Sequence, residues 1–334
     1  MKQYQAHEHS KFKTIPKFKI DLDEAPENRW NAVVKAYKNK FDGVMNVMDK
    51  LLEGFMGTIL SWVTWYNSDR VFYIEELKAI SEKSGVALER LIILQLCYEL
   101  FACCTSVLIN ENDKIIHYRT MDWEMPELKD LTIDVDFVRK GHIIFSATTW
   151  AGYVGVMTAT KPDVCTVALN YRRLGDGVLT NYTKSVNGSW PVGFLIRHLL
   201  ETENDYNKIK GYLSHSPLIS PCYLTIGGSK AGQGVVLSRT RESVDKIQNL
   251  GQADKDFLVQ TNIDHDREID PTVSNIMYST QRIDNVKKIM KKYVKTFDLN
   301  NVINTFNVWP IINESTIYVT VMCCADDRMC SYIC

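Results

Sequence analysis

The chain has 334 residues, and its 39 lysines and arginines nearly balance its 40 aspartates and glutamates, giving a formal net charge of −1 at pH 7. This balance excludes the broad positive field that nucleic-acid-binding proteins need, so we expect no nucleic-acid partner. With 45% hydrophobic residues the chain can bury a sizeable core, either as one body or as two domains.

Helical patterns dominate the first hundred residues. Pro26 fits the first turn of a helix whose apolar residues continue to Tyr37. Further helices are predicted over residues 44–52, 75–80 and 88–101. The apolar stretch 54–66, with Trp62 and Trp65, is too short to span a membrane. It predicts either core or a surface that dips into a lipid interface.

A β-hairpin is predicted next, with strands over residues 105–109 and 114–119 and a four-residue loop between them. In a symmetric hairpin Cys104 lies opposite Arg119, about 5 Å away at Cβ. A guanidinium beside a thiol favours the nucleophilic thiolate, and Asp122 follows where the strand ends. This pattern predicts a reactive cysteine, although a buried inert thiol and an ordinary surface arginine would give the same letters.

The rest of the chain mixes strand and helix patterns. Strands are predicted over residues 131–137, 143–148, 153–158, 164–169, 222–226, 235–239 and 317–322. Helices are predicted over residues 192–203, 209–213 and 282–293. Helices combined with many antiparallel-looking strands predict the α+β class.

Several segments resemble the acid ceramidase family. Residues 98–106 resemble the junction at which acid ceramidases are cut into two subunits, and residues 119–122 resemble an Arg-Asn-Met/Leu-Asp element, with Thr120 in place of the asparagine. The resemblance runs from about Phe18 to Cys334, and N-acylethanolamine acid amidase shares the pattern. Other similar segments follow in the family order: 151–155, 226–228, 232–236, 260–264 and 316–320. Segments 98–101 and 259–262 and the Cys330/Cys334 pair favour the ceramidase branch.

The resemblance implies a fold and a division of the chain. The family belongs to the N-terminal nucleophile hydrolases, which cut their own precursors directly before the nucleophile. It implies a four-layer αββα sandwich preceded by a mainly helical N-terminal segment. Residues 1–103 would form a helical α-subunit or propeptide-like segment and residues 104–334 the catalytic β-subunit, with the cut between Cys103 and Cys104. The new α-amine at Cys104, with an ordinary pKa of about 8, can act as base for its own thiol.

The resemblance also implies roles for individual residues. Cys104 attacks the amide carbonyl and forms an acyl thioester that water hydrolyses. Asp122 holds the new amine, and Arg119 contributes positive potential beside the thiolate. Asn262 donates its side-chain amide to the oxyanion of the tetrahedral intermediate, and one such donor is worth about 3 to 4 kcal/mol.

Four further positions are possible site residues. Asn170 and Arg172 match a family Asn/Asp-Glu-Arg element in which Tyr171 stands in place of the glutamate. That carboxylate would balance the active-site arginine and shape the entrance, so Tyr171 is expected to alter substrate preference or pH optimum. Arg282 matches one member of a paired arginine motif.

We therefore expect an autoprocessed cysteine amidase that hydrolyses a lipid amide, with ceramide as the first candidate substrate. An N-acylethanolamine acid amidase is the alternative, and a lipid-binding homologue without catalysis, marked by Thr120 and Tyr171, is a third possibility. Neither a cofactor nor a metal ion is expected, because the 7 histidines show no ligand spacing beyond a weak His7/His9 pair. The expected partners are the lipid substrate, a membrane surface or lipid aggregate, and the two subunits of one precursor.

The resemblance alone implies that the protein is lysosomal. Family members are lysosomal glycoproteins, whereas residues 1–10 contain no apolar signal core. Sequons at Asn181, Asn187 and Asn313 would permit glycosylation. Cys330 and Cys334 are spaced like a terminal disulfide of ceramidases.

Overall fold

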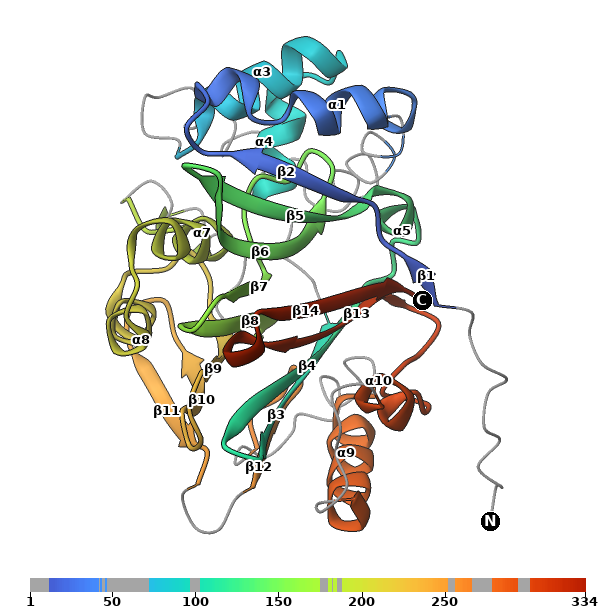
Figure 1. Ribbon diagram of the computed structural model, residues 1–334, viewed down its shortest axis with the longest axis vertical. Helices are drawn as coiled ribbons and strands as arrows, with labels where there is room; N and C mark the ends of the chain where they lie inside the picture. Colours follow the sequence, from blue (N-terminus) through green and yellow to red (C-terminus); the bar gives the residue numbers. More distant parts are fainter. Residues whose placement is uncertain are drawn as a thin grey trace.

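Two stacked β-sheets form the centre of the computed structural model (Figure 1), which confirms the α+β class. The structure describes residues 12–41, 43, 46, 72–96, 103–174, 180–181, 183–184, 188–251, 256–265, 278–293 and 301–334. One sheet has six strands in the order β1-β14-β13-β4-β3-β12, and the other has eight in the order β11-β10-β9-β8-β7-β6-β5-β2.

The six-stranded sheet is antiparallel throughout. Its strands are β1 (Lys13–Thr14), β3 (Cys103–Glu111), β4 (Lys114–Asp122), β12 (Phe257–Gln260), β13 (Thr316–Cys323) and β14 (Arg328–Ile333). Helices α9 (Ser279–Tyr293) and α10 (Val302–Phe306) contact this sheet at β12 and β13. Because β4 and β13 are covered on both faces, almost every residue in them is buried.

The eight-stranded sheet is antiparallel except for the parallel pair β2 and β5. Its strands are β2 (Lys17–Asp21), β5 (Thr132–Arg139), β6 (His142–Trp150), β7 (Thr158–Lys161), β8 (Cys165–Tyr171), β9 (Cys222–Gly228), β10 (Gly234–Arg239) and β11 (Val244–Asn249). Helices α7 (Val192–Thr202) and α8 (Tyr206–His215) contact β6 and β9 respectively. The short helix α5 (Glu127–Leu131) leads from β4 into β5.

Helices and two strands make up the described part of the N-terminal segment. The helices are η1 (Pro26–Asn28), α1 (Asn31–Tyr37), η2 (Lys38–Lys40), α3 (Ile74–Ser84) and α4 (Leu88–Leu96), and they gather at the top of Figure 1. Pro26 begins η1 as predicted, but the helix expected to continue to Tyr37 is divided into η1 and α1. Strands β1 and β2 join one sheet each, so this segment is built into both sheets. The helix predicted over 44–52 and the apolar stretch 54–66 lie almost entirely outside the described residues.

A buried ion cluster ties the N-terminal helices to α7. Glu76 on α3 accepts hydrogen bonds from Arg29 at 2.9 Å and from Trp30 at 2.6 Å. Both terminal nitrogens of Arg197 on α7 also donate to this carboxylate, each at 2.7 Å. The cluster therefore joins three elements that lie far apart in the sequence.

The predicted strand 153–158 is wrong, because β7 begins only at Thr158. The preceding residues form a loop in which Gly152 has a φ of 92°. The backbone N–H of Val154 donates to the side chain of Gln95 at 2.8 Å, and that of Val156 donates to the carbonyl of Gly193 at 3.0 Å. Helices thus satisfy the backbone groups that a neighbouring strand would otherwise pair. The other strands and helices predicted within the described residues are confirmed with small shifts at their ends.

The predicted hairpin exists, but its register is wrong by two residues. Asn112 and Asp113 have φ angles of 46° and 66° and form a two-residue turn between the paired residues Glu111 and Lys114. Such left-handed turns match the twist of hairpin strands and suit Asn and Asp. Cys104 therefore pairs with Met121, and Arg119 pairs with Ser106. Because side chains alternate with a period of two, Arg119 still lies on the same face of the sheet as Cys104.

The disulfide implied by the resemblance is not formed. Cys330 and Cys334 are both free. Cys330 lies within β14 and Cys334 directly follows it. Four residues of extended chain separate their Cα atoms by about 13 Å, well beyond the 7 Å limit for a bridge.

Two of the three sequons are engaged inside the fold. Asn181 is only 6% exposed, and its side-chain oxygen accepts hydrogen bonds from Arg241 at 2.5 and 3.0 Å. The side-chain nitrogen of Asn313 donates to the carbonyl of Pro310 at 3.2 Å. A glycan on Asn181 would have no room unless this buried side chain moved. Asn187 lies outside the described residues.

Among the described residues, no helix combines the length and the apolar character that crossing a bilayer requires. Within the same residues, no three histidine, cysteine, aspartate or glutamate side chains are grouped so that they could hold a metal ion.

Candidate active site

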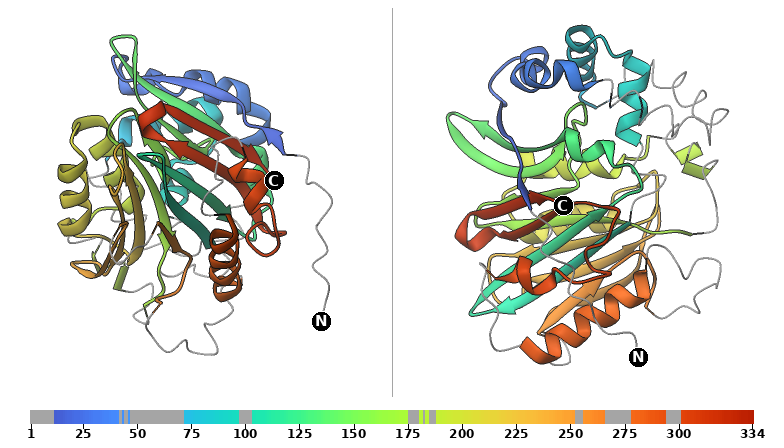
Figure 2. Two further views of the ribbon diagram at one scale, coloured as in Figure 1. Left: turned by 60° about the horizontal axis from the view of Figure 1, so that its bottom comes forward. Right: turned by 90° about the vertical axis from the view of Figure 1, so that its right-hand side faces the viewer.

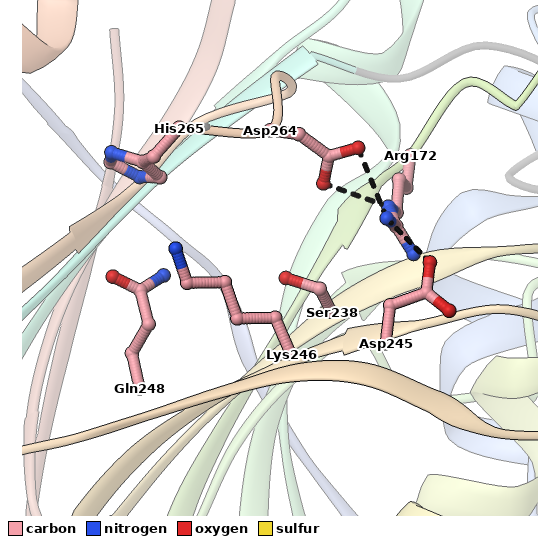
Figure 3. Close-up of a pocket in the computed structure, with 7 residues that line it drawn as sticks. All are labelled: Arg172, Ser238, Asp245, Lys246, Gln248, Asp264 and His265. Atoms are coloured by element: carbon pink, nitrogen blue, oxygen red, sulfur yellow. Dashed lines mark hydrogen bonds and ion pairs between the residues drawn. The ribbon is translucent and has the colours of Figure 1, made fainter. Parts of the chain in front are cut away.

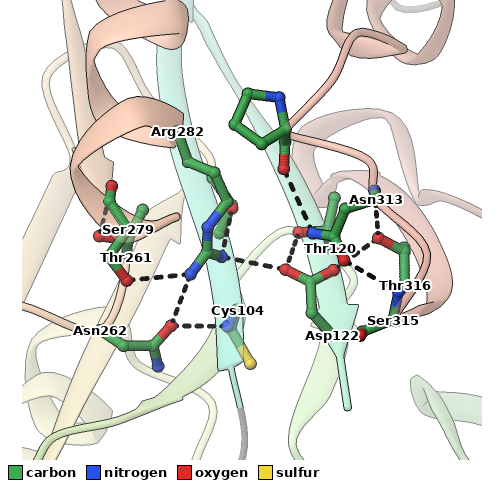
Figure 4. A network of polar contacts seen from close by, with 12 residues as sticks. Cys104, Thr120, Asp122, Thr261, Asn262, Ser279, Arg282, Asn313, Ser315 and Thr316 are labelled. Carbon is green, nitrogen blue, oxygen red and sulfur yellow. Dashed lines mark hydrogen bonds and ion pairs between the residues drawn. The ribbon is translucent and has the colours of Figure 1, made fainter. Parts of the chain in front are cut away.

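Cys104 is the second residue of β3, a strand of the six-stranded sheet, and it is fully buried. The backbone N–H of Cys104 donates to the side-chain oxygen of Asn262 at 2.7 Å (Figure 4). The thiol points into the main core cluster, with its Sγ 3.7 Å from Sδ of Met121. The nitrogen of the bond expected to be cut is therefore held by a side-chain amide, while the thiol lies against Met121 in the core cluster.

Asn262 follows β12, and the pairing of Gln260 with Ser106 brings it to Cys104 across 158 residues of sequence. Its oxygen also accepts a hydrogen bond from Arg282 at 3.2 Å. Its nitrogen donates to the backbone carbonyl of Tyr171 at 2.9 Å. These three contacts fix the orientation of the amide toward Cys104.

Arg282 on α9 connects the amide of Asn262 to the carboxylate of Asp122. One terminal nitrogen donates to Asp122 at 3.0 Å and to the hydroxyl of Thr105 at 2.9 Å. The other donates to Asn262 and to the hydroxyl of Ser279, the latter at 3.0 Å. The guanidinium is fully buried, so these contacts make it the centre of the polar network in Figure 4.

Asp122 is a fully buried carboxylate at the end of β4. Its Oδ1 accepts a hydrogen bond from Thr316 at 2.7 Å, and Thr120 lies 3.4 Å from its Oδ2. Burial raises the pKa of Asp122, and the positive charge of Arg282 opposes that rise without cancelling it. The carboxyl can therefore take up a proton at a higher pH than an ordinary aspartate.

Arg119 lies on the same face of the sheet as Cys104. Its guanidinium donates to the side-chain oxygen of Asn170 at 2.7 Å and contacts Sδ of Met121 at 3.8 Å. Asn170 in turn donates to the carbonyl of Cys104 at 3.3 Å. Arg119 thus places a positive charge in the buried region of the thiol, and Met121 lies between them.

Arg172 binds two carboxylates that do not belong to the network around Cys104. It is 2% exposed and forms ion pairs with Asp264 and Asp245 in a polar pocket of about 170 Å³ (Figure 3). The pocket is lined by Arg172, Ser238, Asp245, Lys246, Gln248, Asp264 and His265. The side chain of Tyr171 packs against the main core cluster, and its carbonyl accepts a hydrogen bond from Asn262. The structure thus gathers Cys104, Asp122, Asn262 and Arg282, places Arg119 and Asn170 beside them, and leaves Arg172 outside this network.

Three hydroxyl residues of the network were not expected as site residues. Thr105 and Ser279 bind Arg282, and Thr316 binds Asp122. Thr105 and Thr316 stand in segments that resemble family elements, which is the signal that could have identified them. Ser279 stands in no such segment.

The two adjacent cysteines differ in surroundings. Cys103 pairs with Asp122 across the hairpin and shares its face, whereas Cys104 shares a face with Arg119. Burial raises the pKa of the Cys103 thiol to about 12. Cys103 therefore stays protonated, and the positive potential of Arg119 lies on the side of Cys104.

Comparisons with known proteins match nearly the whole chain. A family model described as the beta subunit of N-acylethanolamine-hydrolyzing acid amidase matches residues 13–69. The N-acylethanolamine-hydrolyzing acid amidase of Caenorhabditis elegans is 33% identical, covering 91% of this chain and 88% of that protein. The acid ceramidase of Rattus norvegicus is 28% identical, covering 96% and 86%.

A solved structure also matches this fold. The Caenorhabditis elegans N-acylethanolamine-hydrolyzing acid amidase ortholog superimposes with a TM-score of 0.60 at 32% identity, over 69% of this chain and 100% of that chain. The alignments with the amidase and with the ceramidase therefore both cover nearly all of the chain, including the residues around Cys104. The chain belongs to the acid ceramidase and N-acylethanolamine acid amidase family, and it is an N-terminal nucleophile hydrolase of the linear amide C–N bonds of lipids.

Proposed function

We propose that the chain is a precursor that cuts itself between Cys103 and Cys104 and then hydrolyses a lipid amide with Cys104 as nucleophile. The observation that carries this proposal is the 2.7 Å hydrogen bond from the Cys104 N–H to Asn262, whose oxygen Arg282 also contacts. Arg282 extends the same network to Asp122. A side-chain amide thus binds the nitrogen that the cut would release, and a cation and a carboxylate extend the network from that amide.

The cut is an acyl transfer within the chain. The Sγ of Cys104 attacks the carbonyl carbon of Cys103, a thioester forms, and the peptide C–N bond breaks. The released nitrogen takes up the proton that the thiol lost and becomes the α-amine of Cys104. Water then hydrolyses the thioester, leaving a carboxylate on Cys103 and a free thiol on Cys104.

Substrate turnover repeats this chemistry on an external amide. The α-amine, with an ordinary pKa of about 8, accepts the thiol proton, and the thiolate attacks the substrate carbonyl. The side-chain amide nitrogen of Asn262, which also binds the carbonyl of Tyr171, is the proposed donor to the oxyanion. The leaving amine takes the proton from the α-amine, and water hydrolyses the acyl thioester.

We propose residues 1–103 and 104–334 as the two subunits, with residues 104–334 forming a four-layer αββα body. Two features support this. Helices α7 and α8 lie against one sheet, and α9 and α10 against the other. The solved relative is covered completely by 69% of this chain, the same share that Cys104 to Cys334 makes up.

For the substrate we propose a long-chain N-acylethanolamine, because the relative with that name has the higher identity, 33% against 28% for the ceramidase. Ceramide is the second candidate, since residues 98–101 and 259–262 resemble the ceramidase branch. We also propose an acidic compartment such as the lysosome, because both relatives carry acid activity in their names.

The test compares wild type, Cys104→Ala and Cys103→Ala on palmitoylethanolamide and on ceramide at acid pH. The wild type should release fatty acid from palmitoylethanolamide faster than from ceramide. Cys104→Ala should release none, and Cys103→Ala should retain turnover because its thiol takes no part. A correctly cut wild type that hydrolyses neither lipid would contradict the proposal.

A further inference from the structure

The ion pair between Arg172 and Asp264 lies close to the site in the sequence, because each residue follows a site residue, Asn170 or Asn262, by two positions. Arg172 directly follows Tyr171, the last residue of β8, and Asp264 lies two residues after Asn262. Nε of Arg172 donates to Oδ1 of Asp264 and a terminal nitrogen donates to Oδ2, both at 3.0 Å. Figure 3 shows this two-point contact, which fixes the angle between the groups as well as their distance.

This contact is largely shielded from solvent. Arg172 is 2% exposed, and the side chain of Asp264 is 17% exposed. The hydroxyl of Tyr223, which is itself buried, donates to Oδ1 of Asp264 at 3.0 Å. Asp264 therefore accepts two hydrogen bonds from Arg172 and one from Tyr223. Together they hold its carboxylate against the end of the eight-stranded sheet.

The same two backbone segments also meet at the catalytic amide. The nitrogen of Asn262 donates to the carbonyl of Tyr171, the neighbour of Arg172. The end of β8 and the loop after β12 are thus joined at two adjacent points, one charged and one neutral. If the charged contact loosens, the loop can move away from β8 and the amide loses its fixed direction toward Cys104.

We propose that Arg172 and Asp264 act as a positioning pair, which aims the amide of Asn262 at the oxyanion by clamping the loop after β12 to the end of β8. This rests on the proposed function, in which Asn262 is the oxyanion donor. Asp245 on β11 pairs with the same guanidinium at 2.9 Å but lies outside the clamped loop. It therefore offers a matched control.

The experiment measures palmitoylethanolamide hydrolysis and the rate at which iodoacetamide alkylates Cys104, for wild type, Asp264→Asn and Asp245→Asn. Alkylation of a thiol forms no oxyanion, so it reports the thiol without the amide of Asn262. Asp264→Asn should lower kcat at least about 10-fold, part of the roughly 10²- to 10³-fold that loss of one oxyanion donor costs. Its KM and its alkylation rate should stay at the wild-type values, and Asp245→Asn should match wild type throughout.

Each other outcome overturns the proposal. Equal kcat in Asp264→Asn and wild type, equal loss in both variants, or alkylation that falls together with kcat would remove the positioning role. If Asp264→Asn does not fold, Tyr223→Phe replaces it, and an unchanged kcat in that variant would count against the clamp. An inactive or uncut wild type would instead defeat the proposed function itself.

Discussion

Two buried arginine–carboxylate pairs in this molecule differ in role: one stabilises the fold, and the other belongs to the candidate active site. Arg197 with Glu76 and Arg282 with Asp122 have fully buried side chains and lie at 2.7 and 3.0 Å. Glu76 also accepts hydrogen bonds from Arg29 and Trp30, so four N–H donors fill its two oxygens. Asp122 has one arginine nitrogen and two hydroxyls, one of them at 3.4 Å.

The difference appears in the pKa of each carboxyl group. Burial acts to raise the pKa of Glu76, but Arg197 and the hydrogen-bond donors outweigh it and hold the pKa below its ordinary value. Around Asp122 burial prevails over Arg282, and the pKa lies above its ordinary value. A carboxylate surrounded by charged donors is fixed as an anion and holds the fold together, whereas one with fewer donors can exchange protons at a reactive site.

Glu76→Gln should produce the largest change. It leaves Arg197 buried without its full counter-charge, a loss of about 3 to 5 kcal/mol in the free energy of unfolding. The lowered pKa of Glu76 means that its contribution is present above about pH 4.3 and is lost as pH falls through the folded-state pKa. Urea unfolding at several pH values measures both effects. The neighbouring Glu75→Gln, an exposed residue paired with Lys78, is the control, and an equal loss in both variants would break the comparison.

Arg282→Gln should affect catalysis most. It removes the link between Asp122 and Asn262, and we expect kcat to fall about 10²- to 10³-fold, as for loss of an electrostatic donor. Because Arg282 opposes the effect of burial, its removal raises the pKa of Asp122 further. The acidic limb of the pH–rate profile should therefore move to higher pH. Lys288→Gln, which removes an exposed charge from the same helix, is the control and should leave kcat and the pH profile unchanged. A wild-type pH profile in Arg282→Gln would contradict the role of this pair.

The smallest effects should separate the two hydroxyls on Asp122. Thr316 donates at 2.7 Å, so Thr316→Val should lower kcat about 10-fold, within the range for a hydrogen bond to a charged group. Thr120 lies at 3.4 Å, and Thr120→Val should change kcat about 2-fold at most. Both hydroxyls lower the pKa of Asp122, so both variants should shift the acidic limb upward, Thr316→Val more. Equal shifts would show that hydrogen-bond length does not govern this carboxyl.

Local patterns in the sequence predict elements better than they predict the site. Strands and helices with clear periodicity are found where expected. The hairpin register differs from the prediction, because Asn112 and Asp113 form a two-residue turn. Arg119 therefore lies opposite Ser106 and not opposite Cys104. The loop at 151–157 differs because Gln95, from a distant helix, binds its backbone.

The site itself depends on contacts between distant parts of the chain. Asn262 and Arg282 reach Cys104 and Thr105 through the pairing of β12 with β3 and the position of α9. No spacing in the sequence encodes these contacts, and only the resemblance to a family pointed to both residues. Ser279 binds Arg282 within one turn of the same helix, and nothing in the sequence distinguished it from other serines.

The most direct test is the mass and the N-terminal sequence of the mature protein. Incubation at acid pH should yield a fragment beginning at Cys104, and Cys104→Ala should remain in one piece. The two wild-type fragments should stay associated under native conditions, since Glu76 and Arg197 lie on opposite sides of the cut. An uncut wild-type chain that hydrolyses lipid amides at full rate would contradict the central claim, because Cys104 would then have no α-amine to act as its base.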